Sequence, residues 1–222
     1  MLQKRTKADY VVSKWSGGTT TQLAIFPPTA NYADRDFLWR VSSATVDLEE
    51  SDFTLLPDYD RLIATLEGGI ELTHNGGPTL TLRPLEVHAF SGSDVTHSRG
   101  RCRDFNLMLR RGRVTGTMEV LHLSAAPTNL SVGTSIACPP PPAPEQVLLY
   151  CVEGTAYVGA AIGRPPEAIS SDPYAGTGIA CPPSLHLLPG ESILLSAPDA
   201  LTLTGPAVLM LCRIKSQDGE QS

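Results

Sequence analysis

The fold is decided by two stretches that repeat one pattern, Arg61-Leu-Ile-Ala-Thr-Leu-Glu-Gly68 and Val147-Leu-Leu-Tyr-Cys-Val-Glu-Gly154. Each is an apolar run that ends in Glu-Gly and is followed by another short apolar run. A Pro-x-Glu turn comes next in both copies, at Pro84–Glu86 and at Pro189–Glu191, and leads into a further apolar run. This shared order indicates an internal repeat of one β unit. The alternative is two unrelated β segments that happen to use the same turn chemistry.

The rest of the chain also consists of short apolar runs. Its 19 Gly and 19 Pro separate runs that are rich in Val, Ile, Leu and Thr. Such runs predict the short strands of a β-sandwich or barrel. No window holds a helical period, and the best helical candidate is a turn near Asp47–Asp52. The expected strands are Phe37–Val46, Arg61–Leu66, Ile70–Thr73, Thr79–Leu82, Val87–Phe90, Phe105–Leu109, Gln146–Val152, Thr155–Val158, Leu185–Leu188, Ser192–Leu195 and Ala207–Arg213.

Two proline-rich segments suggest how the chain is divided. Cys138–Pro144 contains five prolines and predicts a stiff, extended linker. We therefore expect one domain over residues 1–137 and a second over residues 138–222, with strand exchange between the second domain and the N-terminal segment as an option. Gly159–Pro183 predicts a long surface loop.

Composition excludes several classes of function. The net charge is −6, and the densest basic stretch, Arg99–Arg113, is interrupted by Asp104, so we expect no nucleic-acid partner. No signal peptide is visible at the start, and no apolar run is long enough to span a bilayer, so we expect no membrane partner. The five cysteines form no CxxC pair, which argues against a disulfide framework and fits a reducing, cytoplasmic location.

Several longer motifs occur in a fixed order between Val12 and Arg110. They are Trp39-Arg40-Val41-Ser42-Ser43-Ala44, Phe53-x-x-x-Pro57-x-x-x-Arg61, Leu66-Glu67-Gly68-Gly69, Leu82-x-Pro84-Leu85 and Asp104-Phe105-Asn106-Leu107-Met108. With them the chain resembles the HutD/Ves family of the cupin superfamily, while its second half matches only in pattern. The resemblance implies an all-β fold of two tandem cupin-like (jelly-roll) β-barrels, that is, a bicupin.

The chain departs from this family near its start. The usual motif is Trp-x-Asn-Gly-Gly-Gly-x-Thr-Arg-Glu, whereas this chain has Trp15-Ser16-Gly17-Gly18-Thr19-Thr20-Thr21-Gln22. Backbone N–H groups of Gly-Gly followed by hydroxyls can bind an anion. The alternative is a bulged first strand with Trp15 capping the barrel. The difference predicts a divergent branch of the family, and it leaves open whether the ligand is that of the histidine-utilisation members.

The resemblance also predicts a barrel without metal. Metal-binding cupins carry a Glu ligand seven residues before the glycine of this motif, and seven residues before Gly68 stands Arg61. The histidine ligands would fall within Thr54–Pro57, which contains none. His97 lies near the register of the last ligand, but one histidine alone cannot make a three- or four-ligand site. We therefore predict no metal and no cofactor.

A permanently charged guanidinium in that place suits a carboxylate or another small anion. We predict Arg61 as the anion anchor; the other candidate ligand-binding residues are Asn106, Arg40, Ser42, Asp104 and His97. Three alternatives stay open: an ion pair of Arg61 with Asp104 or Asp60, a structural role for Arg40, and stabilisation of a turn or bulge by Asp104 and Asn106. No catalytic residue is predicted, because no nucleophile motif is recognisable.

The resemblance implies an accessory or regulatory protein that binds a small anionic metabolite, with N-formylglutamate or urocanate as examples from histidine utilisation. The alternative is a metal-independent isomerase or lyase, in which Arg61 binds the substrate and His97 or His88 moves protons. A third option is a subunit whose main role is assembly with another protein. We expect a homodimer, because cupins often pair through sheet edges.

Overall fold

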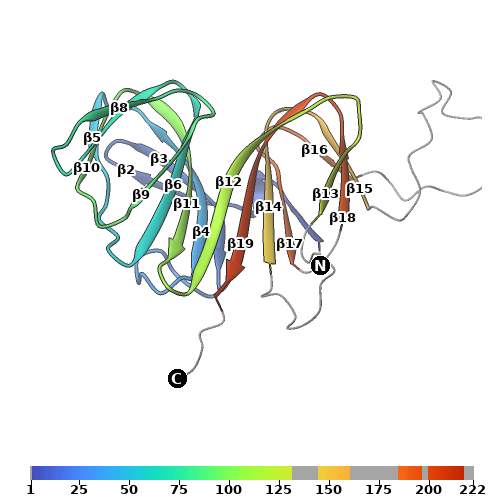
Figure 1. Cartoon of the computed structure of the whole chain (residues 1–222), viewed down its shortest axis with the longest axis horizontal. Coiled ribbons are helices and arrows are strands. Elements are labelled where there is room, and N and C mark those ends of the chain that lie inside the picture. Colours follow the sequence, from blue (N-terminus) through green and yellow to red (C-terminus); the bar gives the residue numbers. More distant parts are fainter. Residues whose placement is uncertain (1, 132–144, 161–184, 197–199, 218–222) are drawn as a thin grey trace, which may run out of the picture.

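The computed structural model describes residues 2–131, 145–160, 185–196 and 200–217. They form four antiparallel sheets arranged as two sandwiches that lie side by side (Figure 1). The chain is thus all-β, as the sequence predicts, apart from a short 3-10 turn at Lys7–Asp9. No helix in the described part of the chain is long and apolar enough to cross a membrane.

The first sandwich combines a six-stranded sheet, in the order β2-β3-β4-β11-β6-β9, with a four-stranded sheet, in the order β5-β10-β7-β8. A shared apolar core joins the two sheets, with Ile63 from one and Leu72 from the other. The strands are β2 (Val11–Trp15), β3 (Gly18–Phe26), β4 (Trp39–Val46), β5 (Glu50–Asp52), β6 (Tyr59–Glu67), β7 (Ile70–His74), β8 (Thr79–Leu82), β9 (Val87–Ser91), β10 (Thr96–Arg99) and β11 (Cys102–Arg110).

The second sandwich combines a five-stranded sheet, β1-β17-β14-β19-β12, with a four-stranded sheet, β13-β18-β15-β16. Its own core lies between these sheets and includes Leu149, Leu187 and Leu203. The strands are β1 (Leu2–Arg5), β12 (Val114–Leu123), β13 (Thr128–Ser131), β14 (Glu145–Gly154), β15 (Ala156–Ala160), β16 (Leu185–Leu187), β17 (Ser192–Ser196), β18 (Ala200–Thr204) and β19 (Ala207–Ser216).

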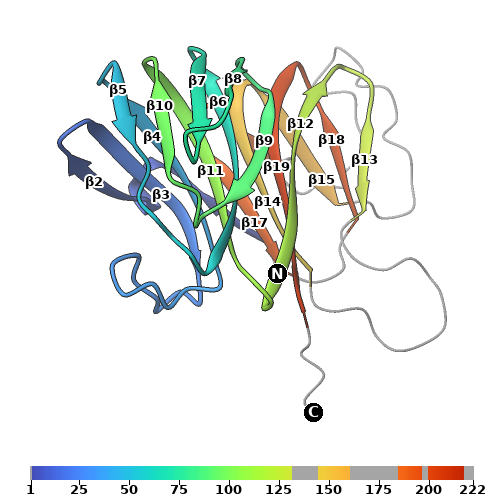
Figure 2. The same cartoon turned by 60° about the vertical axis from the view of Figure 1, so that its left-hand side comes forward.

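Three strands from before residue 137 belong to the second sandwich. β1 pairs with β17. β12 pairs with β19 and β13 with β18 (Figure 2). The strands from 114 to 131 therefore lie with the second set of sheets, although the expected first domain runs to residue 137. The expected linker at Cys138–Pro144 and most of the expected loop at Gly159–Pro183 fall outside the described residues.

The internal repeat is visible in the strand order. The run β4-β11-β6-β9 of the first sandwich corresponds to β12-β19-β14-β17 of the second, and β5-β10-β7-β8 corresponds to β13-β18-β15-β16. All eight strands correspond in both sequence order and neighbours. β2 and β3 are additions to the first copy, and β1 is an addition to the second.

The Glu-Gly turns end equivalent strands in the same way. Gly68 and Gly154 have φ of 71° and 77°, a left-handed backbone that favours glycine. A Cβ on Gly68 would lie 2.5 Å from Arg101 O, and one on Gly154 would lie 1.9 Å from Pro206 O. Both conformation and close approach therefore require glycine here.

The Pro-x-Glu turns are also alike. Glu86 accepts a hydrogen bond from Arg83 N (3.0 Å) and Glu191 accepts one from Leu188 N (2.9 Å). The residue before each Glu has a positive φ, 66° at Leu85 and 87° at Gly190. Each carboxylate thus closes its own turn, which explains why Glu recurs at this position.

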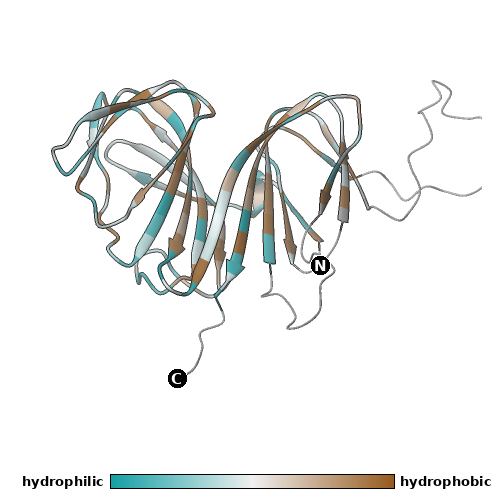
Figure 3. Ribbon diagram, viewed as in Figure 1, coloured by the Kyte–Doolittle hydropathy of each residue, from teal (hydrophilic) through white to brown (hydrophobic). Residues whose placement is uncertain are grey.

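Apolar side chains on the outer faces of the two large sheets hold the sandwiches together. Phe105 of β11 packs against Tyr150 of β14, with ring centroids 5.3 Å apart, and Trp39 Nε1 donates to Gln146 Oε1 at 2.7 Å. The strands at this junction are buried on both faces, so they read as nearly continuous apolar runs. Figure 3 shows the brown segments that recur along the strands of both sandwiches.

Several strands differ from the sequence-based expectations. Glu50–Asp52, where we expected a helical turn, is a strand paired with β10, because its side chains alternate between the sandwich interior and solvent. The other strands outside the expected runs are β1, β2, β3, β10, β12, β13 and β18. In β12, the longest of them, Thr, Glu and His interrupt the apolar residues on the exposed face.

Replacement of Gly154 by alanine tests the turn geometry. We expect Gly154→Ala to lower the free energy of unfolding by about 2 kcal/mol or more, because both the φ and the contact with Pro206 O must change. Gly76→Ala is the matched control, since Gly76 has a φ of 67° but open space around it. It should cost only about 1 kcal/mol. Urea unfolding of both variants measures the difference, and equal losses would contradict the close-approach argument.

Candidate functional site

Five of the predicted site residues converge on the inner face of the six-stranded sheet. On the central strand β11, Asp104 and Asn106 alternate with apolar side chains that face the second sandwich. Asn106 is paired in register with Ser42 of β4, and Met108 lies between Arg40 of β4 and Arg61 of β6. The period of two in each strand therefore directs all these polar side chains toward one place.

That place is a cavity of about 290 Å³ inside the first sandwich. Its lining residues are Ser13, Trp15, Thr20, Tyr32, Arg40, Ser42, Ala44, Val46, Ser51, Asp52, Phe53, Thr54, Arg61, Asp104, Asn106 and Met108. The predicted residues Arg61, Asn106, Arg40, Ser42 and Asp104 are all among them. The cavity thus has polar groups on its floor and aromatic rings around them.

Arg61 is 6% exposed, and its guanidinium is only partly satisfied. One terminal nitrogen donates to Asn106 Oδ1 at 3.1 Å, and the other makes a long bond of 3.4 Å to Thr54 O. Its Nε is buried without a hydrogen-bond partner. Burial lowers the pKa of Arg61 to about 10, so the group keeps its charge at neutral pH.

Aromatic rings flank this guanidinium. Its Cζ lies 5.0 Å from the ring centroid of Phe53 and 4.9 Å from that of Phe90. Such cation–π contacts compensate part of the lost hydration. The rings therefore fix the plane of Arg61 without using its N–H groups.

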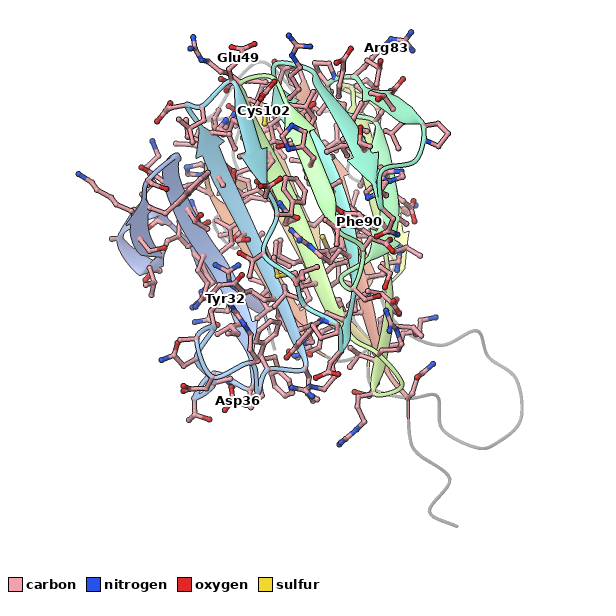
Figure 4. The ribbon with its side chains drawn as sticks, turned by 90° about the vertical axis from the view of Figure 1, so that its left-hand side faces the viewer. Tyr32, Asp36, Glu49, Arg83, Phe90 and Cys102 are labelled. Carbon is pink, nitrogen blue, oxygen red and sulfur yellow. The ribbon has the colours of Figure 1, made fainter. Side chains whose placement is uncertain are left out.

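Arg40 is 5% exposed and carries a second positive charge into the cavity. Its Nε donates to Gln22 Oε1 at 2.8 Å, and Nη1 donates to Ser42 Oγ at 3.0 Å. Its Cζ lies 4.3 Å from the ring centroid of Tyr32, which is labelled in Figure 4. Burial lowers the pKa of Arg40. Its partners are all neutral, so its charge is not cancelled by contact.

Asp104 is the buried carboxylate of the cavity. Burial raises its pKa to about 6, while the hydrogen bonds from Ala44 N–H and Asn106 and the charges of Arg61 and Arg40 lower it. Its Oδ1 accepts the Ala44 N–H bond at 2.8 Å, next to a register shift at Arg103/Asp104. Among the described residues, no ion pair within 4.0 Å joins Asp104 to either arginine. The other lining carboxylate, Asp52, is exposed and lies 2.9 Å from His97 Nδ1, so the two buried arginines face one buried carboxylate.

The alternative partner for Arg61, Asp60, is engaged elsewhere. Asp60 Oδ1 accepts hydrogen bonds from Nη2 and Nε of Arg111 at 2.8 and 3.0 Å on the surface. The structural alternative for Asp104, by contrast, agrees with its bond to Ala44 N. Asp104 therefore both stabilises the strand pair and faces the cavity.

His97 does not join the other predicted residues. It lies on the outward face of β10, where its Nδ1 is 2.9 Å from Asp52 Oδ1. In sequence, His97 lies near the position of the last metal ligand of cupins. In β10, however, Thr96 and Ser98 point inward, so the ring of His97 points to solvent.

The divergent Ser16-Gly17 stretch forms the turn of the β2–β3 hairpin. This hairpin brings Trp15 and Thr20 to the cavity.

Sequence reasoning missed the aromatic residues Tyr32, Phe53 and Phe90 as site components. Phe53 belongs to the motif that ends in Arg61, and Phe90 is paired with Arg61 across β6 and β9, so strand register was an available signal for Phe90. Tyr32 comes from the loop between β3 and β4 and has no periodic signal.

A larger cavity of about 480 Å³ lies between the sandwiches, beside Lys7, Tyr10 and Arg103. Arg103 Nη2 is already paired with Glu67 Oε1, at 2.5 Å. This cavity therefore offers less uncompensated charge than the one that holds Arg40 and Arg61, and we place the candidate site in the latter.

Comparisons with known proteins decide the family. The HutD family model matches residues 7–169. This chain belongs to the HutD family. Protein PA5104 of Pseudomonas aeruginosa PAO1, described as a conserved protein of unknown function, superposes with a TM-score of 0.72 at 22% identity, covering 98% of this chain and 100% of that one.

Two further solved structures share this fold. HutD of Pseudomonas fluorescens SBW25 has a TM-score of 0.67 at 20% identity, over 98% of this chain and 100% of that chain. A cupin 2 conserved barrel domain protein of Leptotrichia buccalis has a TM-score of 0.51 at 10% identity, over 97% of this chain and 96% of that chain. The chain therefore shares its fold with a cupin barrel protein.

The pKa of Asp104 gives this HutD-family protein a testable pH dependence. The folded-state pKa of about 6 lies above the ordinary 3.8, so the charged carboxylate opposes folding, and its cost grows as pH rises from 3.8 to about 6 and is constant above that. Asp104→Asn keeps an acceptor for Ala44 N but never ionises. The stability of this variant relative to wild type should rise between about pH 4 and pH 6, by at most about 3 kcal/mol, and level off at higher pH.

Thermal unfolding across this pH range measures the effect. Asp60→Asn, which alters an exposed pair with Arg111, is the control and should show no such rise. A difference between Asp104→Asn and wild type that stays constant with pH would contradict the buried-carboxylate description.

Proposed function

We propose that this HutD-family protein is a metal-free accessory or regulatory protein that binds a small carboxylate between Arg40 and Arg61. In this proposal the two sandwiches are tandem cupin-like barrels, and the first holds the ligand. The observation that carries the proposal is the buried Arg61 Nε without a hydrogen-bond partner in a cavity where two buried arginines face one buried carboxylate. A buried donor without an acceptor costs about 1–3 kcal/mol, which a bound anion would recover.

The geometry suits a carboxylate. Arginine binds carboxylates through two parallel N–H···O bonds, and Nε with its neighbouring terminal nitrogen forms one such fork. On Arg61 the Nε is idle, and Nη2, the terminal nitrogen on the Nε–H side, carries two N–H groups, of which Asn106 Oδ1 accepts one at 3.1 Å. The second N–H of Nη2 and the Nε–H are the pair that a carboxylate would bind, while Nη1, with its 3.4 Å bond to Thr54 O, lies on the other side of the guanidinium.

Charge supports an anion over a neutral ligand. With Asp104 ionised the three groups sum to one positive charge, and with Asp104 protonated they sum to two. Arg40 and Arg61 are both more than nine-tenths buried, where a charge without a counterion costs several kcal/mol. An entering anion compensates this cost, and its own charge raises the pKa of Asp104 further.

The size and walls of the site narrow the class of ligand. A volume of about 290 Å³ fits a small metabolite, and the rings of Trp15, Tyr32 and Phe53 favour a flat or short organic body attached to the carboxylate. N-formylglutamate and urocanate both fall in this class. They are therefore the first ligands to test.

A second candidate is a metal-independent enzyme, such as an isomerase or lyase. The observation in its favour is Asp104, because a carboxylate with a pKa of about 6 can accept and return protons near neutral pH. In this version Arg61 binds the substrate carboxylate and Asp104, rather than His97 or His88, moves the proton. Turnover of a bound carboxylate that is lost in Asp104→Asn would favour the enzyme.

Calorimetric titration with formate, urocanate and N-formylglutamate tests the binding proposal. We expect at least one to bind wild type and to raise its melting temperature, as mass action requires. Arg61→Met should weaken that binding by about 10- to 100-fold, because a charge-assisted hydrogen bond is worth about 1.5–3 kcal/mol. Arg61→Lys keeps the charge but not the two parallel N–H groups, so its affinity should lie between those of wild type and Arg61→Met.

The matched control is Arg111→Met, which removes a surface arginine paired with Asp60. Its affinity should equal that of wild type. Equal affinity of wild type and a folded Arg61→Met variant would remove Arg61 as the anchor, and no binding of any small carboxylate would remove the proposal.

A further inference from the structure

Two histidines from different sheets meet at one edge of the first sandwich. His74 ends β7 of the four-stranded sheet, and His88 lies on β9, the edge strand of the six-stranded sheet. Their Nε2 atoms are 2.9 Å apart, which is hydrogen-bond distance. β7 and β9 share no backbone ladder, so this contact links the sheets through side chains alone.

The neighbouring hydrogen bonds assign the proton positions. The hydroxyl of Thr96 donates to Asp94 O at 3.2 Å, so Thr96 Oγ1 accepts from His74 Nδ1–H, at 2.8 Å. Neutral His74 then has its lone pair on Nε2, and His88 Nε2–H donates to it. The result is a series of hydrogen bonds with one direction of donation, from His88 to His74, from His74 to Thr96 and from Thr96 to the backbone carbonyl of Asp94.

Phe90 connects this pair to the arginine cavity. Its ring centroid lies 5.0 Å from that of His74 and 5.8 Å from that of His88, while Arg61 Cζ lies 4.9 Å from the same ring. Phe90 is labelled on β9 in Figure 4. The histidine pair therefore supports the ring on which Arg61 rests.

We propose that His74 and His88 form a proton-operated clasp between the two sheets, closed while the pair carries at most one extra proton and open when it carries two. One added proton leaves an N–H···N bond between an imidazolium and a neutral ring. A second proton puts two N–H groups against each other, so the bond is lost and two like charges are added. Opening frees β9 and the Phe90 ring beside Arg61.

Among the described residues, no carboxylate forms an ion pair within 4.0 Å with His74 or His88. On the adjoining turns, Asp94 is bonded to Asn75 and Ser91, and Glu86 is bonded to Arg83. The inward side chains on neighbouring strands are uncharged apart from Arg61: Ile63, Leu72, Leu80, Ser98 and Thr96. Burial first, and then the nearby His74, lower the pKa of His88.

The direction of the pH effect follows from the proton count. Below the ordinary histidine pKa of 6.5 the unfolded chain binds a proton on His88, whereas burial and the nearby His74 lower the pKa of His88 in the folded chain. The stability from the clasp is therefore complete above pH 6.5 and is lost as pH falls below it. The folded-to-unfolded ratio should drop by about tenfold per pH unit, or about 3 °C in melting temperature.

Substitution of His88 separates the hydrogen bond from the titration. In His88→Gln the amide donates to neutral His74 and, after turning, its oxygen accepts from protonated His74, so this clasp stays closed at every pH. His88→Ala cannot close at any pH. His122→Gln, at an exposed position on β12, is the control.

Melting temperatures of the full-length, tag-free chain are measured from pH 7.5 to 5.0 with EDTA present. The melting temperature of His88→Gln relative to wild type should rise as pH falls below 6.5, while His122→Gln runs parallel to wild type and His88→Ala is destabilised already at pH 7.5. Parallel curves for wild type and His88→Gln would overturn the clasp, and so would equal behaviour of His88→Gln and His88→Ala.

Hydrogen exchange locates the opening. After correction for intrinsic rates, the β9 amides at Val87–Ser91 should exchange faster at pH 5.5 than at pH 7.5 in wild type but not in His88→Gln. Acid-induced exchange spread evenly over the sheets would show global loosening and would also overturn the proposal. Neither readout depends on ligand binding, so failure here leaves the carboxylate proposal untouched.

Discussion

The burial of β11 on both faces is the constraint on which the rest of the structure depends. Phe105 and Leu107 point to the second sandwich, while Asp104 and Asn106 point into the cavity of the first. Because the side-chain period of a strand is two, a slip of one residue would place the polar groups in the apolar junction and the apolar groups in the site. The same strand register therefore fixes the contact between the sandwiches and the composition of the cavity.

Much of the fold is predictable from the sequence, because turn chemistry is local. The Glu-Gly and Pro-x-Glu turns require glycine at a left-handed residue and a carboxylate that closes its own turn, and both signals survive in each copy. The assignment of β12 to the second sandwich was not predictable in this way. Its place depends on pairing with β19, about ninety residues later in the chain, and only three-dimensional pairing reveals it.

The candidate site also contains residues that the sequence predicts and residues that it does not. Arg61 was predicted because it stands where related cupins carry a metal ligand, seven residues before Gly68. The other candidates on β4 and β11 came from the motifs of the resemblance, and strand alternation brings them to the same cavity. His97 was chosen from its spacing after the Pro-x-Glu turn, and this prediction did not place it in the cavity. Its strand, β10, directs the ring of His97 to solvent. The aromatic contacts come from loops and edge strands, whose positions depend on tertiary packing.

The most direct test of the account is a crystal structure of the protein grown or soaked with formate or acetate. We predict a carboxylate within about 3 Å of Arg61 Nε, since this is the length of a charge-assisted N–H···O bond, on the side of the cavity that Arg40 faces. A cavity that holds only water under these conditions, with carboxylate bound elsewhere or not at all, would contradict it.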